Sequence, residues 1–253
     1  MMRTNLAAIA MALVFIAAWM GCDDDDPAQP KPNPQPTSAS KVIPAVLDNT
    51  IYQEADTLSN ALGEYLYTGT NVVGPDARRG LILFAIADSI PTGATIDSVS
   101  LQMNLSKASG FVTGATPTAL HVVLASWGEG TSNASDGGPG GTGEGDGGFA
   151  TLGDATWLDR FRGTSLWATP GGDHTPVASA VTSTTSVLGP YTWASPEMAA
   201  DVQSWLDSPA SNFGWLLVGD ESIGGTARQF DSHDNNAPAN RPRLTVHYTT
   251  VGP

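Results

Sequence analysis

Aromatic and polar side chains gather between positions 157 and 167 in a pattern that could bind sugar rings. Trp157, Phe161 and Trp167 could stack on the C–H faces of a glycan, while Asp159 and Arg160 could donate and accept hydrogen bonds that orient it. The same rings could instead bury apolar surface and pin a long surface insertion onto the rest of the domain. We therefore consider these five residues as candidate ligand-binding residues, with a packing role as the alternative.

A second cluster of residues has the chemistry of a metal site. The run DSHD at positions 231–234 sets a histidine between carboxylates, which could bind Zn²⁺ or Ca²⁺ depending on which atoms converge. Further carboxylates lie among the glycines of residues 128–154, where a flexible backbone could suit Ca²⁺; a polar surface loop without metal is the alternative. The candidate metal ligands are Asp231, His233, Asp234, Asp136 and Asp146, and Glu129, Glu144 and Asp154 share the same loop.

No local motif of a known catalytic class is present. The sequence has no H-E-x-x-H, no G-x-S-x-G, no phosphate-binding loop and no dinucleotide-binding fingerprint. Paired carboxylates for glycoside cleavage stay an open alternative, because the fold sets their separation. We therefore expect a protein that is not an enzyme, with a polysaccharide-active enzyme as the minor alternative.

Charge and composition narrow the function classes further. Asp and Glu outnumber Lys and Arg by 25 to 11, the formal net charge is -14, and no basic stripe is present. Binding to nucleic acid is therefore not expected, because that affinity depends on Lys and Arg. Only 14% of residues are charged and 28 are glycine, which indicates a β-rich chain rather than a helical bundle.

The N-terminus has the features of an export signal. Arg3 precedes an apolar run at residues 6–20, and Gly21 stands directly before Cys22, the one cysteine of the chain. This ending resembles the lipobox of bacterial lipoproteins, which implies that residues 1–21 are a signal peptide and that Cys22 receives the lipid. We expect an exported, membrane-anchored protein, at the outer membrane or cell surface rather than the inner membrane. An ordinary secreted protein or an uncleaved anchor is the alternative.

Residues 22–40 predict a tether. Four aspartates at 23–26 are followed by PAQPKPNPQPTSAS, in which closely spaced prolines disfavour helix and favour extended chain. The folded domain is then expected over residues 41–253, with an insertion at about 128–176.

Hydrophobic periodicity within that domain predicts an all-β fold. Val99, Leu101, Met103 and Leu105 alternate with polar residues, as in a strand with one buried face. Continuous apolar runs at 81–86, 120–125 and 213–218 suit strands in the middle of a packed sandwich.

One segment instead predicts a short helix. Ser195, Pro196 and Glu197 are typical of a helix start, and Met198, Val202, Trp205 and Leu206 follow at helical spacing before Pro209.

Several motifs together resemble the DNRLRE domains. They are RRGLILF at 78–84, IPTGATI at 90–96, ADVQSW at 200–205, NFGWLL at 212–217 and RPRLTVHY at 241–248. The resemblance implies a jelly-roll-like antiparallel β-sandwich, found on secreted and surface proteins of bacteria and related to carbohydrate-binding modules with alginate-binding members. Ser232-His233-Asp234 stands where the family usually has Ser-Arg-Glu.

Together these observations predict a lipid-anchored binding or adhesion module, with polysaccharide as the expected partner. The alternative is a structural surface or assembly protein that binds no glycan.

Overall fold

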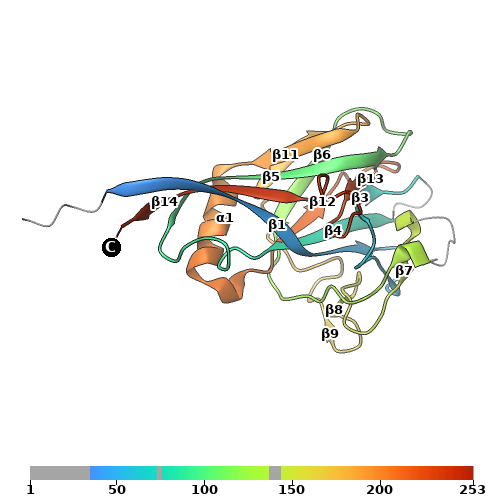
Figure 1. The fold of residues 1–253 in the computed structure, drawn as a ribbon. Helices are drawn as coiled ribbons and strands as arrows, with labels where there is room; N and C mark the ends of the chain where they lie inside the picture. The colour runs from blue at the N-terminus through green and yellow to red at the C-terminus, as the bar shows by residue number, and fades with distance from the viewer. Residues whose placement is uncertain (1–34, 73–75, 137–143, 253) are drawn as a thin grey trace, which may run out of the picture. The chain divides into compact units, whose positions relative to one another are not determined.

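The computed structural model describes residues 35–72, 76–136 and 144–252, which belong to one compact unit of the chain. This unit is an all-β sandwich of antiparallel strands (Figure 1). In chain order the elements are β1 (Pro36–Tyr52), β2 (Leu58–Ser59), β3 (Tyr65–Thr70), β4 (Ala77–Phe84), β5 (Thr95–Ala108), β6 (Thr116–Val122), the short 3-10 helices η1 (Ala134–Asp136) and η2 (Glu144–Asp146), β7 (Gly148–Phe149), β8 (Asp159–Phe161), β9 (Ser165–Leu166), β10 (Ala180–Thr184), β11 (Gly189–Ala194), α1 (Pro196–Asp207), η3 (Pro209–Ser211), β12 (Trp215–Val218), β13 (Arg228–Asp231) and β14 (Arg243–Val251).

Strand pairing defines two layers that share strands at their edges. One layer contains β11, β5, β14 and the first part of β1. In the same layer β13 pairs with the end of β5, and β3 pairs with β13. The other contains β10, β6, β12, β4 and the second part of β1. Because β1 and β3 each pair in both layers, the sheet has a continuous path from one layer to the other.

The main core fills the space between the layers. Leu101 and Met103 of β5 face Ile82 of β4 and Trp215 of β12, and all four side chains are fully buried. The predicted alternation of β5 is confirmed, since Val99, Leu101, Met103 and Leu105 are buried while most residues between them are not.

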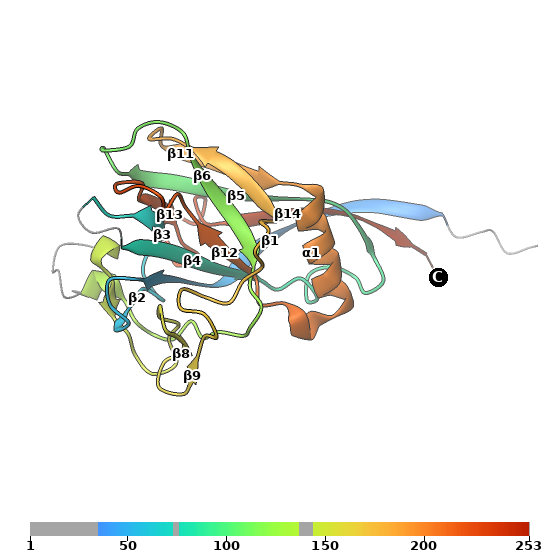
Figure 2. The ribbon, with the colours of Figure 1, turned by 180° about the vertical axis from the view of Figure 1, so that it is seen from behind.

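A second apolar cluster covers the outer face of the layer that contains β4 and β12. Leu81 and Leu216 point away from the main core and pack with Trp127 and with Ala155 and Trp167 of the insertion. Both faces of β4 and β12 are therefore covered, which explains their continuous apolar runs. The insertion, with β8 and β9, lies against this layer in both ribbon views (Figure 2).

The predicted helix is confirmed as α1. Ser195 is its N-cap and accepts a hydrogen bond from the Met198 amide at 3.0 Å, while Pro196 occupies the first turn. Met198, Val202, Trp205 and Leu206 are buried and join the main core. The helix closes one end of the sandwich (Figure 1).

The first strand begins earlier than the predicted domain start. β1 starts at Pro36, inside the segment interpreted as tether, and residues 36–44 pair with residues 243–251 of β14. Their side chains are mostly exposed, so the sequence has no apolar signal there; backbone pairing with β14 forms the strand. Proline is compatible with the first position of a strand, where its missing amide leaves no gap in the ladder.

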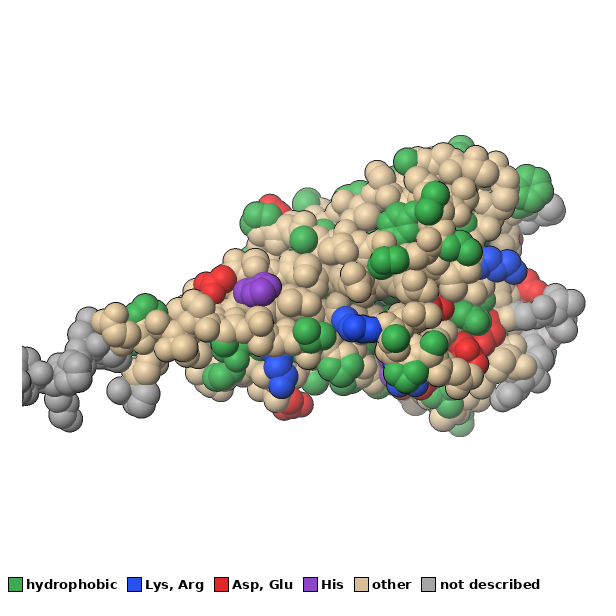
Figure 3. Space-filling view, turned by 45° about the horizontal axis from the view of Figure 1, so that its top comes forward, with side chains coloured by type: hydrophobic (Ala, Val, Ile, Leu, Met, Phe, Trp, Pro, Cys, Tyr) green, Lys and Arg blue, Asp and Glu red, His purple; other side chains and the backbone are tan. Residues whose placement is uncertain are grey.

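Charged side chains are sparse on the described surface. In the face drawn in Figure 3, Lys, Arg, Asp and Glu side chains are scattered between uncharged polar and apolar groups. Several carboxylates of the insertion, Glu129 and Glu144 among them, are partly withdrawn from solvent into hydrogen-bonded positions.

Candidate functional site

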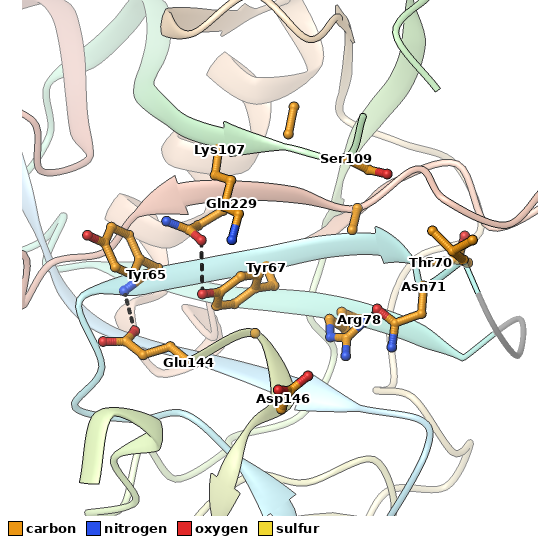
Figure 4. A pocket seen from close by; sticks show the side chains of 14 residues that line it. Tyr65, Tyr67, Thr70, Asn71, Arg78, Lys107, Ser109, Glu144, Asp146 and Gln229 are labelled. Carbon is orange, nitrogen blue, oxygen red and sulfur yellow. Dashed lines mark hydrogen bonds between the residues drawn. The ribbon is translucent and has the colours of Figure 1, made fainter. Parts of the chain in front are cut away.

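A pocket lies between the β3–β13–β5 face and the turn η2. Its volume is about 480 Å³, within the range of about 300–1,000 Å³ typical of small-ligand sites. The lining residues are Tyr65, Tyr67, Thr70, Asn71, Val72, Arg78, Lys107, Ala108, Ser109, Glu144, Gly145, Asp146, Ala227 and Gln229 (Figure 4).

Strand register places three of these side chains in one row across the sheet. Tyr67 of β3 is opposite Gln229 of β13, and Gln229 is opposite Lys107 of β5. The Tyr67 hydroxyl donates to Oε1 of Gln229 at 3.1 Å, and the Gln229 amide donates to Ser106 at 3.2 Å. The row therefore offers an aromatic ring, a fixed amide and an ammonium group to one side of the pocket.

Two tyrosines at alternate positions of β3 lie on this face. Tyr67 is buried and Tyr65 is partly exposed. Burial raises the pKa of the Tyr67 hydroxyl far above its ordinary value, and the nearby Glu144 carboxylate acts in the same direction. Tyr67 is therefore a neutral hydrogen-bonding group at any physiological pH.

The opposite wall of the pocket is η2, which Glu144 holds in place. Its Oε1 accepts the Glu64 amide at 3.1 Å, and its Oε2 accepts the Tyr65 amide at 3.0 Å and the Asn60 side chain at 3.2 Å. Burial raises the pKa of Glu144 above its ordinary value, although these hydrogen bonds lower it. The three bonds tie the insertion to the start of β3.

Arg78 closes the end of the pocket beside Asn71. Its guanidinium bonds the Asn71 side chain, forms an ion pair with Glu54 at 3.3 Å and lies over the Tyr52 ring. The ammonium of Lys107, in contrast, makes no hydrogen bond or ion pair with any described residue, and the side chain is exposed at the pocket rim. The lysine ammonium is thus the cation that is free to meet a ligand here.

The aromatic residues selected from the sequence lie elsewhere, in the insertion. Trp167 is buried in the outer apolar cluster, and its indole donates to the Thr156 carbonyl at 3.0 Å. Trp157 is partly buried under the Arg79 guanidinium, and the Arg160 guanidinium lies over Phe161. Each ring thus has a packing partner within the domain.

The polar members of that group also have local partners. Arg160 donates to Ser126 at 3.0 Å, and Asp159 forms a long ion pair of 3.9 Å with Arg162. The structure does not place these residues in the pocket of β3, β13 and β5.

A cluster of ionisable groups forms where β1, the insertion and the turn after β13 meet. Asp48, Glu129 and His233 each offer one ligand atom, and these atoms lie within 4.8 Å of one another. Nδ1 of His233 is 3.2 Å from Oδ1 of Asp48, and its Nε2 is 3.6 Å from both Oε1 of Glu129 and Oδ2 of Asp234. We call these four residues the Asp48 cluster.

Backbone hydrogen bonds fix the carboxylates of the Asp48 cluster. Oδ2 of Asp48 accepts the His233 amide at 2.6 Å, and Oε1 of Glu129 accepts the Asp48 amide at 2.8 Å. Burial raises the pKa of Asp48 and raises that of Glu129 to about 7. Burial alone would lower the pKa of His233, but contact with Asp48 and the charges of Glu129 and Asp234 outweigh it and raise the value to about 9.

Of the metal ligands selected from the sequence, His233 and Asp234 lie in the Asp48 cluster. Asp231 points elsewhere: its oxygens accept the side-chain amides of Asn104 at 2.7 Å and Asn235 at 3.2 Å. Asp146 lines the pocket, and Asp136 ends η1, outside the cluster.

Sequence reasoning missed Asp48 and the two tyrosines of β3. The signal for Asp48 in the sequence is an acidic residue between the apolar residues Leu47 and Ile51 of β1. The signal for the pocket is the alternation of Tyr65 and Tyr67 in YLYTGT.

Cys22 and the predicted signal peptide lie outside the described residues. Across the part of the chain that the structure describes, no helix has both the length and the apolar character needed to cross a membrane.

Neither the family models nor the curated proteins include a match to this chain. The resemblance to DNRLRE domains therefore stays a prediction from the motifs.

Proposed function

We propose that this protein is a non-catalytic glycan-binding module whose ligand occupies the pocket between β3, β13, β5 and η2. The observation that supports this most is the row formed by Tyr67, Gln229 and Lys107 along one side of the pocket. Sugar recognition combines an aromatic face with a few oriented polar groups, and this row has both.

The chemistry of the two walls suits a polyhydroxylated ligand. The Gln229 amide is held by Tyr67 and Ser106, so its orientation is set before a ligand arrives. Lys107 adds three donors without a competing partner among the described residues, and Asp146 adds acceptors from the opposite wall. Preorganised groups of this kind lose less entropy when they bind.

The sequence motifs point in the same direction. The likeness to DNRLRE domains implies a carbohydrate-binding sandwich, and the lipobox-like end at Cys22 implies export and a lipid anchor. Under this proposal the Pro-rich segment holds the glycan-binding domain away from a membrane, at the outer membrane or the cell surface. Nucleic acid is not a proposed partner, because the chain is strongly acidic.

The hydrogen bonds of Glu144 favour binding over hydrolysis. Both of its oxygens accept hydrogen bonds from backbone or side-chain amides, so this carboxylate supports η2 rather than pointing unpartnered at a ligand. A glycosidase needs a carboxylic acid positioned to protonate the leaving oxygen.

A glycan-array screen tests the proposal. The full-length chain, kept in mild detergent because residues 6–20 are apolar, is applied to neutral and acidic polysaccharides beside a protein of similar charge. The proposal predicts retention on at least one glycan class, without release of reducing ends. Absence of retention across the array, with a folded protein by circular dichroism, would contradict it and favour a structural surface role. Self-association at rising concentration would support that role directly.

A further inference from the structure

We propose that the Asp48 cluster is a binding site for a divalent transition-metal ion of the Zn²⁺ type, held by Asp48, Glu129 and His233. The ion joins the start of the insertion to β1 and to the turn after β13. This inference is independent of the glycan pocket.

The first argument is the distances between the ligand atoms. Zn²⁺ bound at about 2.0–2.2 Å holds tetrahedral ligand atoms about 3.3–3.6 Å apart. An imidazole binds an ion through one of its nitrogens, and Nε2 of His233 already lies 3.6 Å from an oxygen of Glu129. One ligand atom from each of Asp48, Glu129 and His233 lies within 4.8 Å of the other two, so side-chain rotation can bring the three to this spacing.

The second argument is a buried oxygen that has no hydrogen-bond partner. Asp48 is 1% exposed, and its Oδ1 makes no hydrogen bond with any described residue although it faces the imidazole of His233. Nδ1 of His233 and Oδ2 of Asp234 are also buried and lack a hydrogen bond of acceptable geometry. Buried polar atoms without hydrogen-bond partners are rare in folded proteins, and three of them here belong to one cluster.

The third argument is charge. Asp48, Glu129 and Asp234 surround one imidazole, and each places a carboxylate oxygen within 3.6 Å of a ring nitrogen of His233. A divalent cation among these carboxylates brings two positive charges to the cluster and allows a neutral imidazole to act as a ligand.

The donor set favours Zn²⁺ over Ca²⁺, the two ions that the sequence left open for this run. Ca²⁺ takes six to eight oxygen ligands, whereas this cluster combines an imidazole nitrogen with a few carboxylate oxygens. His233 and Glu129 are partly exposed, which allows water to complete the coordination. Asp234, beside Nε2 of His233, can supply a further oxygen.

The fold gives the ion a structural role. Glu129 begins the insertion, and the side chain of Asn49, next to Asp48, donates to its carbonyl at 2.9 Å. Asp48 belongs to β1, and His233 follows β13. One ion therefore joins three segments that are far apart in sequence.

Metal titration of the full-length chain tests this inference. After treatment with EDTA and removal of the chelator, the protein is titrated by calorimetry with Zn²⁺, and separately with Ca²⁺ and Mg²⁺. We expect one Zn²⁺ site that is filled before any other, an increase of the melting temperature with Zn²⁺, and weaker binding of the other two ions.

Four variants locate the site. Glu129→Gln keeps the hydrogen bond from the Asp48 amide, and His233→Ala removes the imidazole; each should weaken the Zn²⁺ site at least tenfold. His247→Ala, on an exposed position of β14, and His174→Ala, beside His121, should bind Zn²⁺ as the unaltered protein does. Circular dichroism confirms that each variant is folded, and Glu129→Gln alone decides the outcome if His233→Ala does not fold.

Three results would overturn the inference. The first is that the unaltered protein binds no Zn²⁺. The second is that Glu129→Gln binds Zn²⁺ as tightly as the unaltered protein does. The third is that His174→Ala, rather than Glu129→Gln, loses the Zn²⁺ site. Tighter binding of Ca²⁺ than of Zn²⁺ at the same residues would overturn the assigned class of metal. None of these results depends on glycan binding.

Discussion

Trp167 distinguishes a packing role of the insertion aromatics from a ligand-binding role. Its side chain is 5% exposed, packs with Leu81 and Leu216, and donates an indole hydrogen bond to the Thr156 carbonyl. We predict that Trp167→Ala lowers the free energy of unfolding substantially and leaves the affinity for a glycan ligand unchanged.

The magnitude follows from the buried area and the lost hydrogen bond. A buried aromatic side chain removes about 150–250 Å² from water, which corresponds to about 4–6 kcal/mol at about 25 cal/mol per Å². The methyl group that alanine retains and partial collapse of the cavity reduce this value. Substitutions of buried Trp by Ala typically cost about 3–5 kcal/mol, and we expect a loss in this range.

Equilibrium unfolding in urea, followed by circular dichroism, measures the loss. Leu166→Ala is the control, because Leu166 is adjacent but 68% exposed and should change the free energy of unfolding by less than about 0.5 kcal/mol. A loss below about 1 kcal/mol in Trp167→Ala, or a loss of glycan affinity in a fully stable variant, would refute the packing role.

Two further predictions concern the framework. A positive φ costs an alanine about 1–2 kcal/mol. Gly214→Ala should destabilise the fold well beyond this cost, because its Cβ would lie 2.0 Å from the Ile82 carbonyl oxygen. Gly93→Ala, which has a similar φ but open space around the Cβ, should show only that cost when both variants are unfolded in urea. Burial raises the pKa of Asp201 above its ordinary value of 3.8, although hydrogen bonds from Ser179 and Trp215 lower it. The contribution of Asp201 to stability is therefore full below the pKa that it has in the unfolded chain, and it declines as the pH rises through the pKa that it has in the folded protein. Asp201→Asn should therefore gain stability relative to the unaltered protein between about pH 4 and pH 7, and a constant difference in unfolding free energy across that range would contradict this.

The sandwich could be predicted from the sequence because its signals are local. Alternation in β5 and the N-cap at Ser195 each depend on a few neighbouring residues, and both are confirmed. The early start of β1 could not be predicted, since residues 36–40 become a strand only by pairing with β14 more than two hundred positions away.

The candidate sites were predictable only in part, because long-range contacts assemble them. His233 and Asp234 were recognised as a dense polar run, but Asp48 is 185 positions away and reaches them through the bond to the His233 amide. The pocket combines β3, β13 and β5, whose register is set by the fold rather than by any one segment. Lys107 therefore has no signal in its own neighbourhood.

The glycan affinity of Lys107→Ala tests the central proposal most directly. Lys41→Ala is the matched control, because Lys41 is also an exposed strand lysine and lies outside the pocket. Removing a charge-assisted hydrogen bond costs about 1.5–3 kcal/mol, so the dissociation constant for the best glycan of the array should rise at least about tenfold. We expect Lys41→Ala to bind as the unaltered protein does. Equal affinity of all three proteins would contradict the assignment of the glycan site to this pocket.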